Sequence, residues 1–130
     1  MKRPKLPENF CCPAEPSDFL APAPLPADES VADEQLAALA KALAHPVRVR
    51  ILRMLAKRDA RMCADIVDEL PLAQSTVSEH LRILRSAGLV AAREDGVRTG
   101  YCIDSVALRR LKALLEQALP TPRPTLQHQP

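Results

Sequence analysis

The stretch DIVDELPLAQSTVSEHLRILRSAGLV, residues 65–90, decides the fold predicted for this chain of 130 residues. Within it, Val77, Leu81 and Leu84 recur at i, i+4 and i+7, the spacing of one buried face of a helix. The opposite face combines small hydroxyls and an amide near its start with arginines farther along: Gln74, Ser75, Thr76, Ser78, Glu79, Arg82 and Arg85. Short polar groups can approach base edges in the major groove, and arginines can contact phosphates. The pattern predicts a DNA-binding helix over about 73–87, although an ordinary solvated helix with a Ser/Thr cap would share it.

The segment that follows favours the DNA-binding interpretation. Gly88 is typical of the residue at which a helix ends. Two β-like runs come next, about 89–94 and 98–104, and the pair Asp95-Gly96 between them is typical of a hairpin turn. A hairpin directly after a DNA-binding helix is the arrangement called a wing.

Two helices are expected upstream. The first covers roughly 31–43, where Ser30 followed by Asp33 resembles a capping arrangement. Pro46 is well placed at the first position of the second helix, which should end near Lys57. Apolar residues recur at helical spacing in both segments, so each helix should bury one face.

A short helix over about 63–70 and a last helix over about 106–118 complete the series. Pro71 ends the short helix, because the residue before a proline is disfavoured in helical geometry. The order is therefore three helices, the DNA-binding helix, a hairpin and a final helix. We predict a mainly α fold with a small β-hairpin, the winged helix-turn-helix.

Composition sets the limits of this domain. The chain is 47% hydrophobic but only 2% aromatic, so its core should be aliphatic, and one domain over 31–119 is expected. Residues 1–30 hold seven of the thirteen prolines and should form a flexible arm, and residues 120–130 a disordered tail. No apolar run approaches the ~20 residues that span a bilayer, and no secretory signal is present. A cytoplasmic protein with reduced cysteines is expected.

Three segments resemble one family: KALAHPVRVRILRML (41–55), the stretch 65–90, and EDGVRTGYCI (94–103). They are similar to the ArsR/SmtB metalloregulators. The resemblance implies a homodimer joined through its first and last helices, with one recognition helix per subunit on an inverted-repeat operator of double-stranded DNA. It also implies repression that a ligand relieves. No enzymatic function is expected, because the three histidines are scattered and no catalytic constellation is apparent.

Three further residues are assigned within this framework. Arg93 and Arg98 flank the hairpin tip and are expected to contact backbone phosphate if the hairpin is a wing. His80 matches a histidine of the family and lies on the flank between Val77 and Leu84. Its role stays open between packing, capping and a phosphate contact.

The ligand sites used in the family can be tested against these residues. A zinc site of the family on the last helix needs Asp-x-His and two later ligands. Here Val106 takes the place of the histidine after Asp104, and Gln117 and Pro120 stand where the later ligands should fall, so this site is absent. The usual Cys-x-Cys arsenic pair of the third helix is also missing. Its positions are Met62 and Ala64, with Cys63 between them.

The remaining arrangement resembles family members with a vicinal cysteine pair in an N-terminal arm and one cysteine near the third helix. Here these are Cys11, Cys12 and Cys63. Neighbouring cysteines bridge only with strain, but two soft thiolates can chelate a soft ion. A third thiolate completes the pyramid of three sulfurs that As(III) or Sb(III) prefers. The resemblance thus implies an As(III)/Sb(III) inducer site made of three cysteines, with no organic cofactor.

Alternatives stay open. A Cd²⁺, Pb²⁺ or Zn²⁺ sensor would recruit Cys102 or a carboxylate of the arm as a fourth ligand. A redox or persulfide sensor would form a disulfide between distant thiols. Cys63 could also be a small core residue and Cys102 a structural one. From a different class, a protein-interaction module could use the same scaffold without binding DNA.

Overall fold

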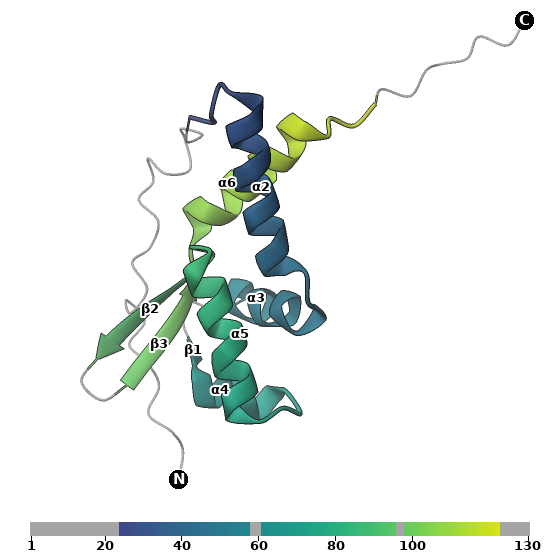
Figure 1. Cartoon of the computed structure of the whole chain (residues 1–130). Coiled ribbons are helices and arrows are strands. Elements are labelled where there is room, and N and C mark those ends of the chain that lie inside the picture. The colour runs from purple at the N-terminus through teal and green to yellow at the C-terminus, as the bar shows by residue number, and fades with distance from the viewer. Residues whose placement is uncertain (1–23, 58–60, 96–97, 123–130) are drawn as a thin grey trace, which may run out of the picture.

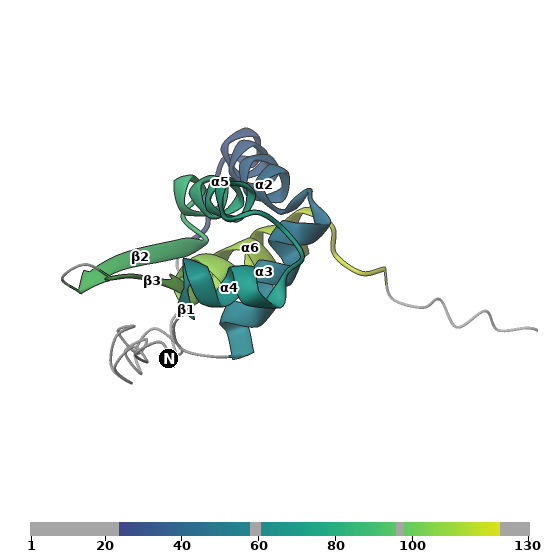
Figure 2. The ribbon, with the colours of Figure 1, turned by 90° about the horizontal axis from the view of Figure 1, so that it is seen from below.

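The computed structural model describes residues 24–57, 61–95 and 98–122 (Figure 1). Its elements, in chain order, are α2 (Glu29–Leu43), α3 (Pro46–Lys57), β1 (Arg61–Met62), α4 (Cys63–Glu69), α5 (Gln74–Ser86), β2 (Val90–Asp95), β3 (Arg98–Ile103) and α6 (Ser105–Ala118). The mainly helical fold with a β-hairpin is the predicted winged helix-turn-helix. Seen from below, the β2–β3 hairpin extends beyond the helices (Figure 2).

Helix α2 begins two residues before its predicted start. Asp28 is the N-cap, and its carboxylate accepts the backbone N–H of Ser30 at 2.8 Å. The prediction that Ser30 and Asp33 cap the helix was therefore wrong. A cap must precede the first helical turn, and Ser30 already lies within that turn.

Arg110 of α6 links this helix to α2 and to the segment before α2. Its guanidinium donates to the side-chain oxygen of Gln35 at 2.7 Å and to the backbone carbonyl of Pro24 at 3.2 Å. The two helices lie side by side (Figure 1). Arg110 thus fastens the segment that leads into α2 onto α6.

Helix α3 begins at Pro46, as predicted. The residue before it, His45, caps it: its Nδ1 accepts the N–H of Val47 at 3.1 Å and its carbonyl accepts the N–H of Val49 at 3.2 Å. Proline suits the first helical position because its missing N–H would have no intrahelical partner there.

The hairpin belongs to a three-stranded antiparallel sheet in the order β1-β3-β2. Strand β1 pairs Arg61 with Tyr101 and Met62 with Gly100. This strand was not predicted, because two residues are too few to show the alternation that marks a strand in the sequence. The pairing anchors the middle of β3 next to the start of α4.

The core is aliphatic, as the composition predicted. Its most deeply buried large side chains are Ile51, Leu55, Ile66, Val77, Leu81, Leu84, Leu89 and Leu114. All of these except Leu114 belong to one cluster, which joins α3, the helix-turn-helix and the loop that leads into the hairpin, and α6 contributes Leu111 to it. Within the described ranges, no helix is long and apolar enough to cross a membrane.

Helix α5 ends in a Schellman motif centred on Gly88. The N–H of Leu89 donates to the carbonyl of Leu84 at 3.0 Å, and the N–H of Gly88 donates to that of Arg85 at 3.0 Å. Gly88 has a φ of +82°, in the left-handed region, and the apolar pair Leu84 and Leu89 is fully buried. The motif turns the chain from α5 directly into β2.

Replacing Gly88 by alanine is expected to destabilise the protein by about 1 kcal/mol, because an L side chain is strained at this φ. No atom lies within 4 Å of the added Cβ, so the loss reflects backbone strain and not a clash. Thermal denaturation should show a midpoint lowered by about 5 °C. Asparagine tolerates the left-handed region better, so Gly88→Asn should lose less; an equal loss would contradict the assignment.

Candidate nucleic-acid interface

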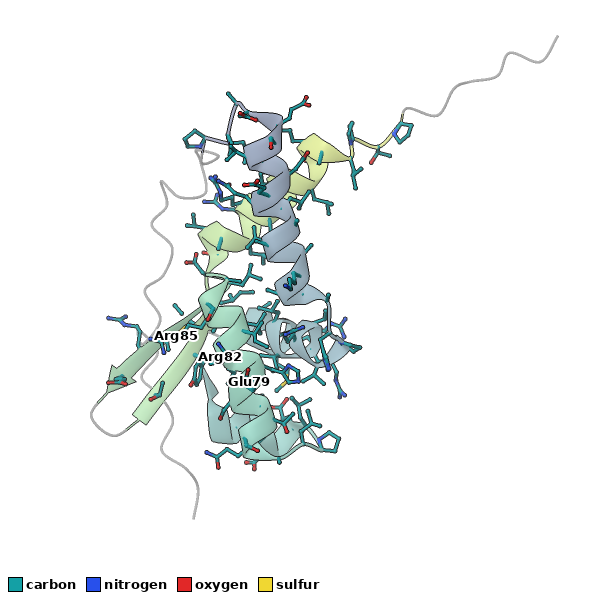
Figure 3. All side chains as sticks on the ribbon, viewed as in Figure 1. Glu79, Arg82 and Arg85 are labelled. Atoms are coloured by element: carbon teal, nitrogen blue, oxygen red, sulfur yellow. The ribbon has the colours of Figure 1, made fainter. Side chains whose placement is uncertain are left out.

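Helix α5 is two-faced, as predicted. The side chains of Val77, Leu81 and Leu84 are each at most 1% exposed. The predicted DNA-binding residues on α5 are all exposed: Gln74, Ser75, Thr76, Ser78, Glu79 and Arg82, with Arg85 beside them. Figure 3 shows Glu79, Arg82 and Arg85 following one another along α5. The core thus fixes the helix so that its polar face points outward.

The start of α5 does not use a side-chain cap. Its N-cap is Ala73, whose carbonyl accepts the N–H groups of Thr76 and Val77, both at 3.1 Å. Ser75 and Thr76 lie inside the first turn, so the Ser/Thr cap that would explain these hydroxyls structurally is not formed. The positive end of a helix also favours an anion such as phosphate. This end of α5 is therefore suited to DNA.

An ion pair orients the central arginine of this face. Arg82 donates from Nε to Oε2 of Glu79 at 2.9 Å and from Nη2 to Oε1 at 2.6 Å. The hydrogen bond from Arg82 lowers the pKa of the Glu79 carboxyl and raises that of the guanidinium. Both side chains are more than half exposed, at 64% and 55%, so the pair is well solvated. It uses two of the five N–H donors of Arg82.

The hairpin carries the two arginines assigned to the wing. Arg93 of β2 is exposed and lies opposite Gly100, and Arg98 begins β3 opposite Asp95, next to the tip. The side chain of Arg98 lies outside the described part of the chain. The phosphate contacts of both residues stay predictions.

The three side chains of the predicted cysteine site lie outside the described part of the chain. Cys11 and Cys12 precede the first described residue. Cys63 is the first residue of α4, and the structure describes its backbone but not its side chain. Among the described residues, no group of three or more His, Cys, Asp or Glu side chains could hold a metal ion. Cys102 on β3 is buried and disulfide-bonded, and its partner sulfur is not among the described side chains.

Asp104 has a structural role. Its carboxylate accepts the N–H of Ala107 at 3.0 Å and so caps α6. In the family pattern this position begins a zinc site, for which the later ligands are lacking here. The cap by itself accounts for an aspartate at this position.

Residues 43–93 match the family model of a helix-turn-helix domain. An HTH-type transcriptional regulator of Methanocaldococcus jannaschii is 36% identical over 84 residues, which are 65% of this chain and 94% of that protein. The regulator YgaV of Escherichia coli is 35% identical over 83 residues, 64% of this chain and 84% of the relative.

A solved structure carries the family name. It is the homodimeric winged helix-turn-helix DNA-binding domain of a possible ArsR-family regulator from Mycobacterium bovis, with 33% identity and a TM-score of 0.58. The alignment covers 74% of this chain and 88% of that one. The repressor SmtB of Mycobacterium tuberculosis is 41% identical over 64 residues, 48% of this chain and 46% of the relative. The chain belongs to the ArsR/SmtB family.

As an ArsR/SmtB protein, the chain is a DNA-binding transcriptional regulator and not an enzyme. Its helix-turn-helix consists of α4 and α5, both inside the matched range 43–93. The relatives show the kind of protein and its fold. The individual DNA contacts of the α5 face and of the wing stay predictions.

Replacing Glu79 by glutamine should tighten binding of this ArsR/SmtB regulator to non-specific duplex DNA roughly threefold, because it removes a negative charge beside the phosphates and releases Arg82. Fluorescence anisotropy with a random-sequence duplex measures the effect. Glu116→Gln, on the exposed surface of α6, removes the same charge away from α5 and should change little. Equal affinities of wild type and Glu79→Gln would contradict a DNA-facing position of Glu79.

Proposed function

We propose that this ArsR/SmtB protein is a metalloid-responsive repressor. A homodimer binds operator DNA through the exposed face of α5 and is released when As(III) or Sb(III) binds Cys11, Cys12 and Cys63. The observation that carries the DNA-binding part is the polar face of α5, held outward by the buried stripe of Val77, Leu81 and Leu84. The regulator would act in the cytoplasm, where DNA is accessible.

Exposed apolar side chains on α2 and α6 support the dimer. Val31 on α2 and Val106, Leu115 and Leu119 on or directly after α6 are 39–70% exposed. Burying such side chains against a second copy is favourable, by about 25 cal/mol for each Å² of apolar surface. A twofold dimer would present two α5 helices to two half-sites about one helical turn apart, so the operator should be an inverted repeat. The relative from Mycobacterium bovis is likewise described as homodimeric.

The chemistry of three thiols supports the metalloid ligand. Soft thiolates select soft ions, and serine or carboxylate oxygens would not replace them. Pro24, whose carbonyl Arg110 holds, lies twelve residues after Cys12, and extended chain covers about 3.3 Å per residue, so the arm could span up to roughly 40 Å. It could reach Cys63 of either subunit, and the family resemblance favours the partner. A solved structure with 31% identity and a TM-score of 0.58 is described as a possible regulator for arsenical resistance.

Release from DNA would follow from the position of Cys63 at the first residue of α4. Helix α4 packs against α5, so an ion that ties the arm to the start of α4 would bias the orientation of the α5 helices in the dimer. The ligand then shifts the population from DNA-binding to non-binding dimers by its preference for the latter.

The disulfide of Cys102 favours a second candidate, a repressor released by oxidation. Two thiols and one molecule of hydrogen peroxide would give one disulfide and two molecules of water. With four cysteines in the chain, an intrachain bond to Cys102 would draw on Cys11, Cys12 or Cys63, so oxidation and metalloid binding would compete. One solved relative, from Vibrio cholerae, is described as reduced HlyU, with 28% identity and a TM-score of 0.57.

Cys102→Ser separates the two candidates. A metalloid sensor with this change should still release DNA on addition of As(III) and should have lost any release by peroxide. An oxidation sensor should respond to peroxide in the wild type under metal-free conditions and should not respond to As(III) at all. Gel shifts with reduced protein, each ligand added alone, measure both responses.

The DNA-binding function is tested by selection. Reduced wild-type protein should enrich one duplex sequence from a random library at pH 7.5, and that sequence should be an imperfect inverted repeat bound by a dimer. Recovery of no enriched sequence would contradict the DNA-binding proposal and favour a protein-interaction module. Release of the enriched duplex by Cd²⁺, Pb²⁺ or Zn²⁺ in place of As(III) would identify the other metal class.

A further inference from the structure

Two histidines meet between α3 and α5. The rings of His45, which precedes α3, and His80, in the middle of α5, lie with their centroids 4.4 Å apart and their planes inclined by 47°. His80 is partly buried on the flank of α5, between the buried stripe and the exposed face. The contact therefore couples the start of α3 directly to the helix that is proposed to bind DNA.

The Nδ1 atoms of the two rings have different surroundings. His45 Nδ1 is an acceptor, because it receives the N–H of Val47 at 3.1 Å. His80 Nδ1 is buried and has no hydrogen-bond partner among the described residues. Protonation would place a charged N–H donor at that buried atom with no acceptor, which is far more costly than an unused lone pair.

Most of the charges around His80 also disfavour its protonated form. Burial lowers the pKa of His80, and the neighbouring His45 and the cationic Arg48 of α3 lower it further. Glu79, on α5 itself, raises it, but that carboxylate is held by Arg82 on the exposed face. From the described parts of α2, α4 and β2, which also pack near α5, no charged group contributes to this shift.

We propose that the His45–His80 contact is a pH-sensitive device that holds α5 in its DNA-binding position when the His80 ring is neutral and loosens it when His80 is protonated. His80 is thus a positioning residue. The proposal rests on the proposed DNA-binding function of α5.

The lowered pKa of His80 sets the expected direction of the pH effect on DNA binding. The contact contributes fully above the ordinary histidine pKa of 6.5, and its contribution is lost as the pH falls below that value, through the lower pKa of the folded state. Ordinary electrostatics predicts the opposite trend, because protonated histidines add positive charge and strengthen DNA binding. The direction of the pH effect therefore separates the device from a general charge effect.

The test uses the full chain and a labelled duplex selected by the wild-type protein at pH 7.5. Anisotropy at constant ionic strength should show several-fold weaker binding at pH 5.5 than at pH 7.5, because a protonated His80 no longer holds α5 in its DNA-binding position. His80→Gln, with a folded state checked by circular dichroism, should lose most of this difference. His128→Gln, which removes the histidine of the C-terminal tail, should retain it. Tighter binding by wild type at pH 5.5, or the same ratio in His80→Gln, would overturn the proposal.

A second measurement does not depend on DNA. The thermal midpoint should fall more between pH 7.5 and 5.5 in wild type than in His80→Gln, and the NMR titration of the His80 ring should have its midpoint below 6.5. If His80→Gln does not fold, His45→Gln replaces it and should reduce the same pH difference. A failure to select any duplex would contradict the proposed function alone, whereas an ordinary or raised titration midpoint of His80 would contradict this inference alone.

Discussion

Replacing Arg82 by alanine is expected to weaken binding of the selected operator by roughly 10- to 100-fold, the effect of losing one good arginine contact to a base or phosphate. The side chain is 64% exposed at the centre of the α5 face, and alanine is a strong helix former, so the fold and the dimer should survive. In the free protein Glu79 holds the guanidinium. DNA must therefore compete with that ion pair, which is solvated and weak.

The comparison for Arg82→Ala is Lys112→Ala, which removes a cation from the exposed surface of α6 and should leave affinity nearly unchanged. Ser78→Ala should also weaken specific binding, since Ser78 shares the exposed face. Wild-type affinity in both Arg82→Ala and Ser78→Ala would show that α5 is not the recognition helix.

Replacing Cys63 by serine should raise the As(III) concentration needed to release DNA on the order of 100-fold, while binding without ligand persists. Loss of a residue that only supports a metal ligand already costs about 10- to 100-fold in affinity, and a direct thiolate ligand should cost at least as much. Serine has nearly the same size but keeps its proton near neutral pH, so it supplies no soft anion. Release half-points from gel shifts measure the effect.

Cys102→Ser is the matched control for Cys63→Ser, because it also removes one sulfur but lies outside the proposed three-thiolate site. Mixed dimers test the geometry. If the site joins two subunits, a dimer of one Cys63→Ser subunit and one subunit lacking Cys11 and Cys12 keeps one complete site. An intact As(III) response of homodimeric Cys63→Ser would remove Cys63 from the sensor.

The parts of the fold that could be predicted are those with a local pattern. Helix α5 was predictable because its buried residues repeat with the helical period and Gly88 follows it. The hairpin was predictable from alternation around Asp95-Gly96. Strand β1 had no such pattern because only pairing with β3 makes those two residues a strand. The start of α2 was misplaced because the side chains of both Asp28 and Ser30 are of a kind that caps helices.

The candidate site was predictable only in part for the same reason. The exposed face of α5 follows from one helix, so its members could be identified from their spacing. The contact between His45 and His80 joins residues that are far apart in the sequence, and nothing local marks it. In the sequence, His45 is marked only by the proline that follows it, and His80 only by its position on the flank of its helix. The packing of α3 on α5 brings the two rings together.

We propose that this ArsR/SmtB regulator releases its operator when As(III) binds three thiolates. The most direct test of this proposal is a titration of the reduced wild-type protein on the selected duplex with As(III), beside a variant with serine at Cys11, Cys12 and Cys63. We predict that As(III) releases the wild type, that the variant binds DNA equally well, and that it stays bound at every As(III) concentration that releases the wild type. A wild type that As(III) does not release, or a variant released at the same concentration, would contradict the claim.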